Sequence, residues 1–76
     1  MPQVACVRYL IVPTRHGWAL SAGGLELGHF PSASRALEAA KEDCAPICRS
    51  GHEAEVFEAT PGGGLEQLWS CPGQLH

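Results

Sequence analysis

The sequence predicts an α+β domain of two layers, in which a four-stranded antiparallel or mixed sheet has one helix packed on one face. Strand-forming segments occur in pairs on both sides of one helix-forming segment, so the expected order is β-β-α-β-β. Proline and glycine punctuate the junctions. The 76 residues suffice for one domain with a thin core. We therefore expect a single domain over residues 1–76, ordered from about 4 to 70, with a loose tail at 71–76.

The first pair of strands begins with residues 4–12, VACVRYLIV, which are rich in β-branched and aromatic types and end at Pro13. This segment is apolar on both sides, which is typical of a strand that is interior or covered on both faces. The alternating segment 18–22, WALSA, completes a hairpin. After Gly23 and Gly24, LEL at 25–27 is either a bulged continuation or an extra short strand.

The helix is predicted over residues 32–45, with Ser32 as its N-cap. Pro46 has no N–H to donate to the carbonyl of Glu42. The helix therefore ends near Ala45, or kinks there and continues for one loose turn until Ser50 and Gly51 stop it. The apolar stripe of this helix consists of Ala33, Ala36, Leu37, Ala40 and Cys44.

The second pair of strands covers residues 52–60 and 65–70, joined by the turn PGGG. With its order and punctuation, the chain resembles an uncharacterised family of short bacterial β-β-α-β-β proteins, a domain of unknown function. The matching residues are IVP at 11–13, GWAL at 17–20 and SASRALEAA at 32–40. The resemblance implies the fold and no activity. Arg35 departs from the family pattern, which has an acidic residue there.

Charge and hydropathy exclude several classes of partner. The net charge is −3, and residues 51–76 contain four glutamates and no Lys or Arg. The five Lys and Arg residues are scattered, which disfavours nucleic-acid binding. No apolar run approaches the length of a membrane span. The first 13 residues do not resemble a signal peptide, so we expect a cytoplasmic protein with reduced thiols.

The stretch CAPICRSGH, residues 44–52, is the candidate metal site. Cys44, Cys48 and His52 are ligand types for zinc or copper, and cysteines four apart share one face of a helix. A fourth ligand could come from Cys6, Cys71 or His76. The spacing is looser than that of zinc modules and contains a proline. The favoured interpretation is that Cys44 extends the apolar stripe, with no cofactor bound.

No catalytic constellation is recognisable, and we expect a protein that is not an enzyme. The chain has cysteines and histidines but no asparagine, and its only aspartate is Asp43. A redox pair at Cys44 and Cys48 is disfavoured, because the dipole at a helix C-terminus does not lower a thiol pKa.

The apolar residues exceed what one helix can cover. We expect the uncovered face of the sheet to carry some of Tyr9, Ile11, Trp18 and Trp69, and exposed apolar patches of this kind are typical of interfaces. The alternative is that the segment around Leu25 and Leu27, or the tail, folds over this face. The sequence thus favours a non-catalytic interaction module that binds an unknown protein partner or forms a homodimer. The second hypothesis is a small zinc- or copper-binding protein.

Overall fold

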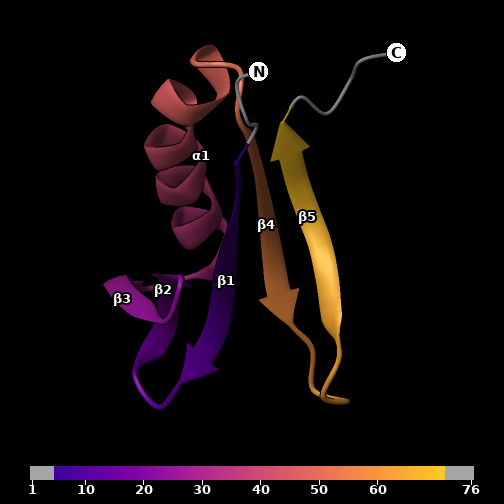
Figure 1. Ribbon diagram of the computed structural model, residues 1–76. Coiled ribbons are helices and arrows are strands. Elements are labelled where there is room, and N and C mark those ends of the chain that lie inside the picture. Colours follow the sequence, from indigo (N-terminus) through magenta and orange to yellow (C-terminus); the bar gives the residue numbers. More distant parts are fainter. Residues whose placement is uncertain (1–4, 72–76) are drawn as a thin grey trace.

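The computed structural model describes residues 5–71 of the chain. Figure 1 shows the helix beside a strongly twisted sheet. In chain order the elements are β1 (Cys6–Thr14), β2 (Gly17–Ala22), β3 (Leu25–Phe30), α1 (Ala33–Arg49), β4 (Glu53–Ala59) and β5 (Leu65–Cys71).

The sheet is mixed and has five strands in the order β3-β2-β1-β4-β5. The central strand β1 pairs with β4 in parallel, and the other three pairings are antiparallel. The predicted α+β class with one helix and a mixed sheet is confirmed, but the predicted number of four strands is wrong. Residues after Gly24 form the separate strand β3, because Gly28, His29 and Phe30 continue the pairing with β2.

The helix begins and ends for local reasons. The Ser32 hydroxyl accepts a hydrogen bond from the Arg35 amide at 3.1 Å, as expected of an N-cap. Of the two alternatives at Pro46, the structure shows the continued turn, since the helix reaches Arg49. Ser50 then donates its hydroxyl to the Pro46 carbonyl at 2.9 Å. Gly51 has φ +88°, a conformation that strongly favours glycine, and it redirects the chain into β4.

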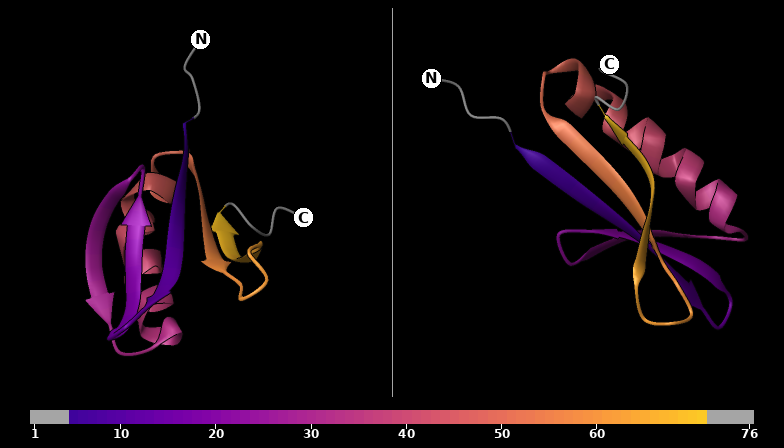
Figure 2. Two further views of the ribbon diagram at one scale, coloured as in Figure 1. Left: turned by 90° about the horizontal axis from the view of Figure 1, so that it is seen from below. Right: turned by 90° about the vertical axis from the view of Figure 1, so that its right-hand side faces the viewer.

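The core lies between α1 and the sheet. Figure 2 shows the helix on one side of the strands. The helix contributes small side chains to this layer, because its fully buried residues are Ala36, Ala40 and Cys44. Small residues let the helix axis approach the sheet closely, and large strand residues fill the remaining volume. The buried residues of the sheet are Tyr9, Ile11, Leu20, Ala54 and Val56.

The C-terminal end of the sheet differs from the prediction. Cys71 is the last residue of β5 and pairs with Ala54, so it does not begin a tail. The remainder of the predicted tail, residues 72–76, lies outside the described residues.

Candidate functional site

The two faces of the sheet are assigned by strand register. Ile11 and Leu20 are opposite each other, both are buried, and both lie on the side of α1. Successive strand residues point to opposite faces, so the neighbours of these residues point away from the helix. In residues 5–71 every other regular element is a strand of the sheet itself, so none covers this second face. We call it the open face.

The four residues predicted to form an interaction face do not lie on the open face. Tyr9 and Ile11 are 2% and 0% exposed and form the centre of the core. Trp18 and Trp69 are partly buried and pack against the same core. The prediction recognised that β1 is apolar on both sides, but it assigned the wrong side to the helix.

The open face has its own apolar centre. Leu10 stands opposite Phe57 of β4, and Val12 stands opposite Ala19 of β2. All four side chains are only half-buried in the single chain. We call Leu10, Val12, Ala19 and Phe57 the open-face cluster. The alternation of β1 made Leu10 and Val12 visible in the sequence, whereas nothing in the pattern of β4 singled out Phe57.

Two pairs of ionisable side chains lie beside the open-face cluster. The Nε atom of Arg8 is 3.1 Å from Oε1 of Glu55, across β1 and β4. On β3, Nδ1 of His29 is 2.8 Å from Oε2 of Glu26. Both pairs are largely solvent-exposed, so each contributes little stability. The Arg8–Glu55 pair joins opposite charges, whereas the Glu26–His29 pair does so only when His29 is protonated.

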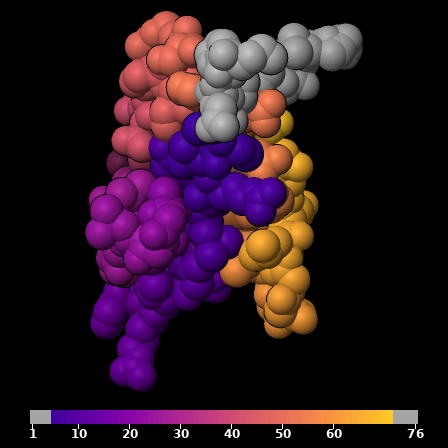
Figure 3. Space-filling model, in the orientation of Figure 1, coloured from indigo at the N-terminus to yellow at the C-terminus, as the bar shows by residue number. Residues whose placement is uncertain are grey.

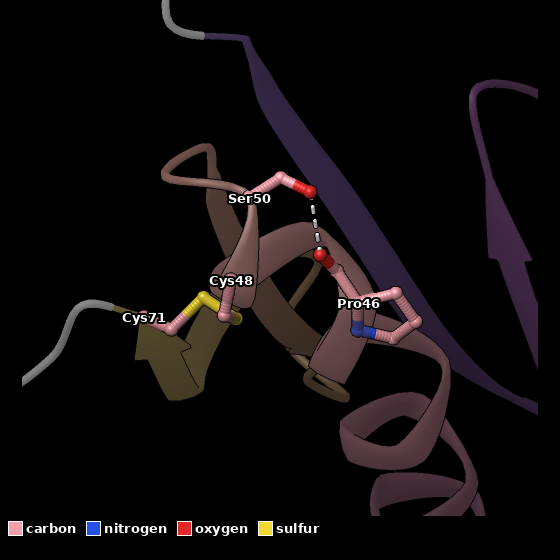
Figure 4. The surroundings of a disulfide bond; sticks show 4 residues. All are labelled: Pro46, Cys48, Ser50 and Cys71. Atoms are coloured by element: carbon pink, nitrogen blue, oxygen red, sulfur yellow. Dashed lines mark hydrogen bonds between the residues drawn. A yellow bond between two sulfur atoms is a disulfide. The ribbon is translucent and has the colours of Figure 1, made fainter.

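The three candidate metal ligands serve other purposes in the structure. Cys48 forms a disulfide with Cys71 that joins the end of α1 to the end of β5, with Cα atoms 6.1 Å apart (Figure 4). His52 accepts a hydrogen bond from the Ala5 amide through Nδ1 at 3.0 Å. The Cys44 side chain is fully buried on the side of α1 that faces the sheet. A metal site using Cys48 would first require reduction of the disulfide.

The disulfide also bears on the expected state of the thiols. The sequence predicted that all cysteines are reduced, but the structure pairs two of the four. Cys6 is an exposed thiol on β1, and Cys44 is a buried one. Within residues 5–71, no three His, Cys, Asp or Glu side chains converge in a way that would hold a metal ion. The possible fourth ligand His76 lies outside the described residues.

At the edge of the core, Tyr9 forms a part-buried hydrogen bond with Asp43, next to the buried Cys44. The Tyr9 hydroxyl donates to Oδ2 of Asp43 at 2.6 Å, which satisfies the hydroxyl at the edge of the core. Burial, followed by the hydrogen bond to Asp43, raises the pKa of Tyr9 well above its ordinary value. Burial also raises the pKa of the Cys44 thiol. A thiol held in its neutral form is a weak nucleophile, so the contact stabilises packing and offers no activated group.

Within the described part of the chain, α1 has neither the length nor the apolar character to cross a bilayer. Comparison of the chain with protein-family models, with curated proteins and with solved structures finds no match.

Proposed function

We propose that this protein is a small non-catalytic interaction module that associates with a second copy of itself through the open face. The observation that supports the proposal is the open-face cluster. Its four apolar side chains extend over three adjacent strands, and in residues 5–71 no element covers them. Uncovered apolar clusters with a polar border are typical of protein interfaces.

A second copy suits this face for two reasons. Sheets pack on sheets about 10 Å apart with interleaved apolar side chains, which is the geometry that a cluster in the middle of a sheet favours. A two-fold interface also brings each surface against itself, so a strongly charged face would repel its copy. The chain has net charge −3, yet the four residues of the cluster carry no charge, and the neighbouring Arg8 and Glu55 form an opposite-charge pair.

Sedimentation equilibrium over a range of protein concentrations tests the proposal. The wild type is expected to associate, and Phe57→Lys is expected to weaken that association at least about tenfold, because it places a charge in the apolar centre. Glu42→Gln on the exposed side of α1 changes the net charge by the same amount and is the matched control. A wild type that stays monomeric up to about 1 mM, or equal effects of both variants, would contradict self-association.

The cytoplasmic location and the resemblance to short bacterial proteins stay predictions. The disulfide provides a test of the location, because such bonds persist in oxidising compartments and are rare in the cytosol. Lysis of the native cells directly into denaturant that contains an alkylating reagent, followed by mass spectrometry, counts all free thiols, including the buried Cys44. Four modified cysteines are expected for a cytoplasmic protein, whereas modification of Cys6 and Cys44 alone would place it in an oxidising compartment.

A further inference from the structure

The edge strand β3 is exposed in a way that monomeric proteins usually avoid. It lies at one end of the strand order and pairs only with β2, and its residues form one flank of the surface in Figure 3. An edge strand presents unpaired backbone N–H and C=O groups, which proteins commonly protect with lysine or proline. The six residues of β3 include neither. Leu25 and Leu27 are 66% and 43% exposed, which places them among the most exposed large apolar residues of the described chain.

The sequence of β3, LELGHF, is complementary to itself when read in the opposite direction. Consider two antiparallel copies related by a two-fold axis between Leu27 and Gly28. Leu25 then stands opposite Phe30 of the second copy, and Glu26 stands opposite its His29. The two-fold axis repeats both pairings, so every charge on one strand meets a potential counter-charge on the other.

A β-bulge makes this register compatible with the faces of the sheet. Leu20 pairs with Gly28 and Ser21 pairs with Glu26, so Leu27 is an extra residue in β3. In a regular strand, residues three apart point to opposite faces. The bulge instead brings Glu26 and His29 to the open face, where Oε2 and Nδ1 are 2.8 Å apart.

The same bulge leaves the outer apolar residues on the helix side. Leu25 pairs with Ala22, and Phe30 pairs with Trp18, and both partners pack against the core. Opposed residues in an antiparallel pair must share a face. The proposed register meets this condition for the Leu25–Phe30 and Glu26–His29 pairs. Moving the two-fold axis onto Leu27 or Gly28 would remove the contact between Glu26 of one copy and His29 of the other.

We propose that β3 pairs with β3 of a second copy in this register and joins two five-stranded sheets into one continuous sheet of ten strands. The opposite edge, β5, does not offer the same complementarity. Its only charged residue is Glu66, which already stands opposite Glu58 of β4, so pairing two copies there would gather negative charge. The β3 edge adjoins the open-face cluster, because His29 pairs with Ala19, but the proposed contact runs along the strand edge and uses none of the four cluster residues. The inference therefore goes beyond the proposed function. Together the two contacts would build assemblies larger than a dimer.

Complementary charge variants test the pairing between chains. His29→Glu places two carboxylates on each β3, and Glu26→Lys places a basic side chain beside His29. Each variant also loses its own Glu26–His29 pair, and mixing does not restore that intrachain pair. Mixing does restore the interchain contacts, because the introduced glutamate then faces the introduced lysine. Rescue by mixing therefore reports contact between copies rather than repair within one chain.

The experiment is run in the Phe57→Lys background, so that association through the open face does not contribute. Native mass spectrometry separates homodimers from heterodimers by mass, and sedimentation equilibrium gives their dissociation constants. The background alone is expected to dimerise, and either charge variant alone is expected to bind itself about tenfold more weakly. Their equimolar mixture is expected to recover the affinity of the background as heterodimer.

Several outcomes would overturn the proposal. A background that is monomeric while the wild type associates leaves only the open face as an interface. A background that dimerises without response to either charge variant places the contact elsewhere, and a monomeric wild type rejects both surfaces. Circular dichroism checks that each variant is folded. If Phe57→Lys is not folded, the experiment uses Leu10→Gln as the background, and the same outcomes support or overturn the proposal.

Discussion

The two faces of the sheet differ in burial although they use the same strands and similar residues. On β1, Tyr9 and Ile11 are almost completely buried, whereas the adjacent Leu10 and Val12 are half-buried. All four are large and apolar, so composition does not distinguish them. The difference arises because α1 covers only one face. Burial therefore depends on which face the helix covers. The half-buried apolar side chains on the other face are available for association.

The largest effect is expected when side chains at two adjacent positions of β1, one on each face, are truncated. Ile11→Ala is expected to lower the free energy of unfolding by about 2–5 kcal/mol, because it leaves a cavity under the helix. Leu10→Ala removes a side chain that water already reaches, and about 1 kcal/mol is expected. Urea denaturation at low micromolar concentration, where association is minimal, measures both. Equal losses at the two positions would mean that the faces are not distinguished by burial.

Removing the disulfide between Cys48 and Cys71 tests how much this bond stabilises the position of β5. Reduction or the double variant Cys48→Ser/Cys71→Ser removes a link between residues 23 apart in sequence. The chain-entropy argument predicts a loss of about 3 kcal/mol in the free energy of unfolding. Cys6→Ser at an exposed thiol is the control and is expected to change stability by less than about 0.5 kcal/mol. A double variant as stable as this control would show that β5 needs no covalent link.

The buried Tyr9 hydroxyl predicts how the covered face responds to alkaline pH. The folded-state pKa of Tyr9 is raised, so folding favours the neutral phenol. Its stabilisation is complete below the ordinary tyrosine pKa of about 10 and is lost as the pH rises above that value. The pKa of Cys44 is also raised by burial, so a further loss of stability is expected as the pH rises above the ordinary pKa of a thiol.

Tyr9→Phe separates the two contributions. The variant is expected to lose about 1 kcal/mol at pH 7, because the hydrogen bond to Asp43 is removed. It should also lose the part of the alkaline destabilisation that begins near pH 10. Urea unfolding between pH 7 and 11 measures both effects. If the wild type and Tyr9→Phe have parallel stability profiles above pH 10, the hydroxyl is not protected by folding.

The smallest expected effect lies at the end of the covered face, beyond the buried core. Glu58 and Glu66 stand directly opposite each other on β4 and β5. Like charges in this arrangement repel, so Glu66→Gln is expected to raise the free energy of unfolding by about 0.5 kcal/mol. Glu42→Gln on the helix surface is the matched control for the change in net charge. Thermal unfolding at low salt measures the stability of both variants, and high salt should reduce the difference in stability between them.

Local sequence signals predicted much of the fold. Ser32 and the Ser50–Gly51 stop act within one or two turns of backbone, so their residue types indicated the helix ends. The stripe of Ala36, Ala40 and Cys44 was also recognisable, because helical periodicity is a local property. The disulfide was not, since Cys48 and Cys71 meet only after β5 has paired with β4.

The candidate site shows even more clearly which features follow from local sequence and which depend on the tertiary structure. The sequence determined that β1 has two apolar faces, because strand residues alternate whatever surrounds them. Only the tertiary structure decided that Tyr9 and Ile11 face the helix while Leu10 and Val12 face outwards, because this depends on which side of the sheet α1 crosses. The sequence likewise determined the charges of β3. The alignment of Glu26 with His29 on one face required a bulge, which exists only when β3 is paired with β2.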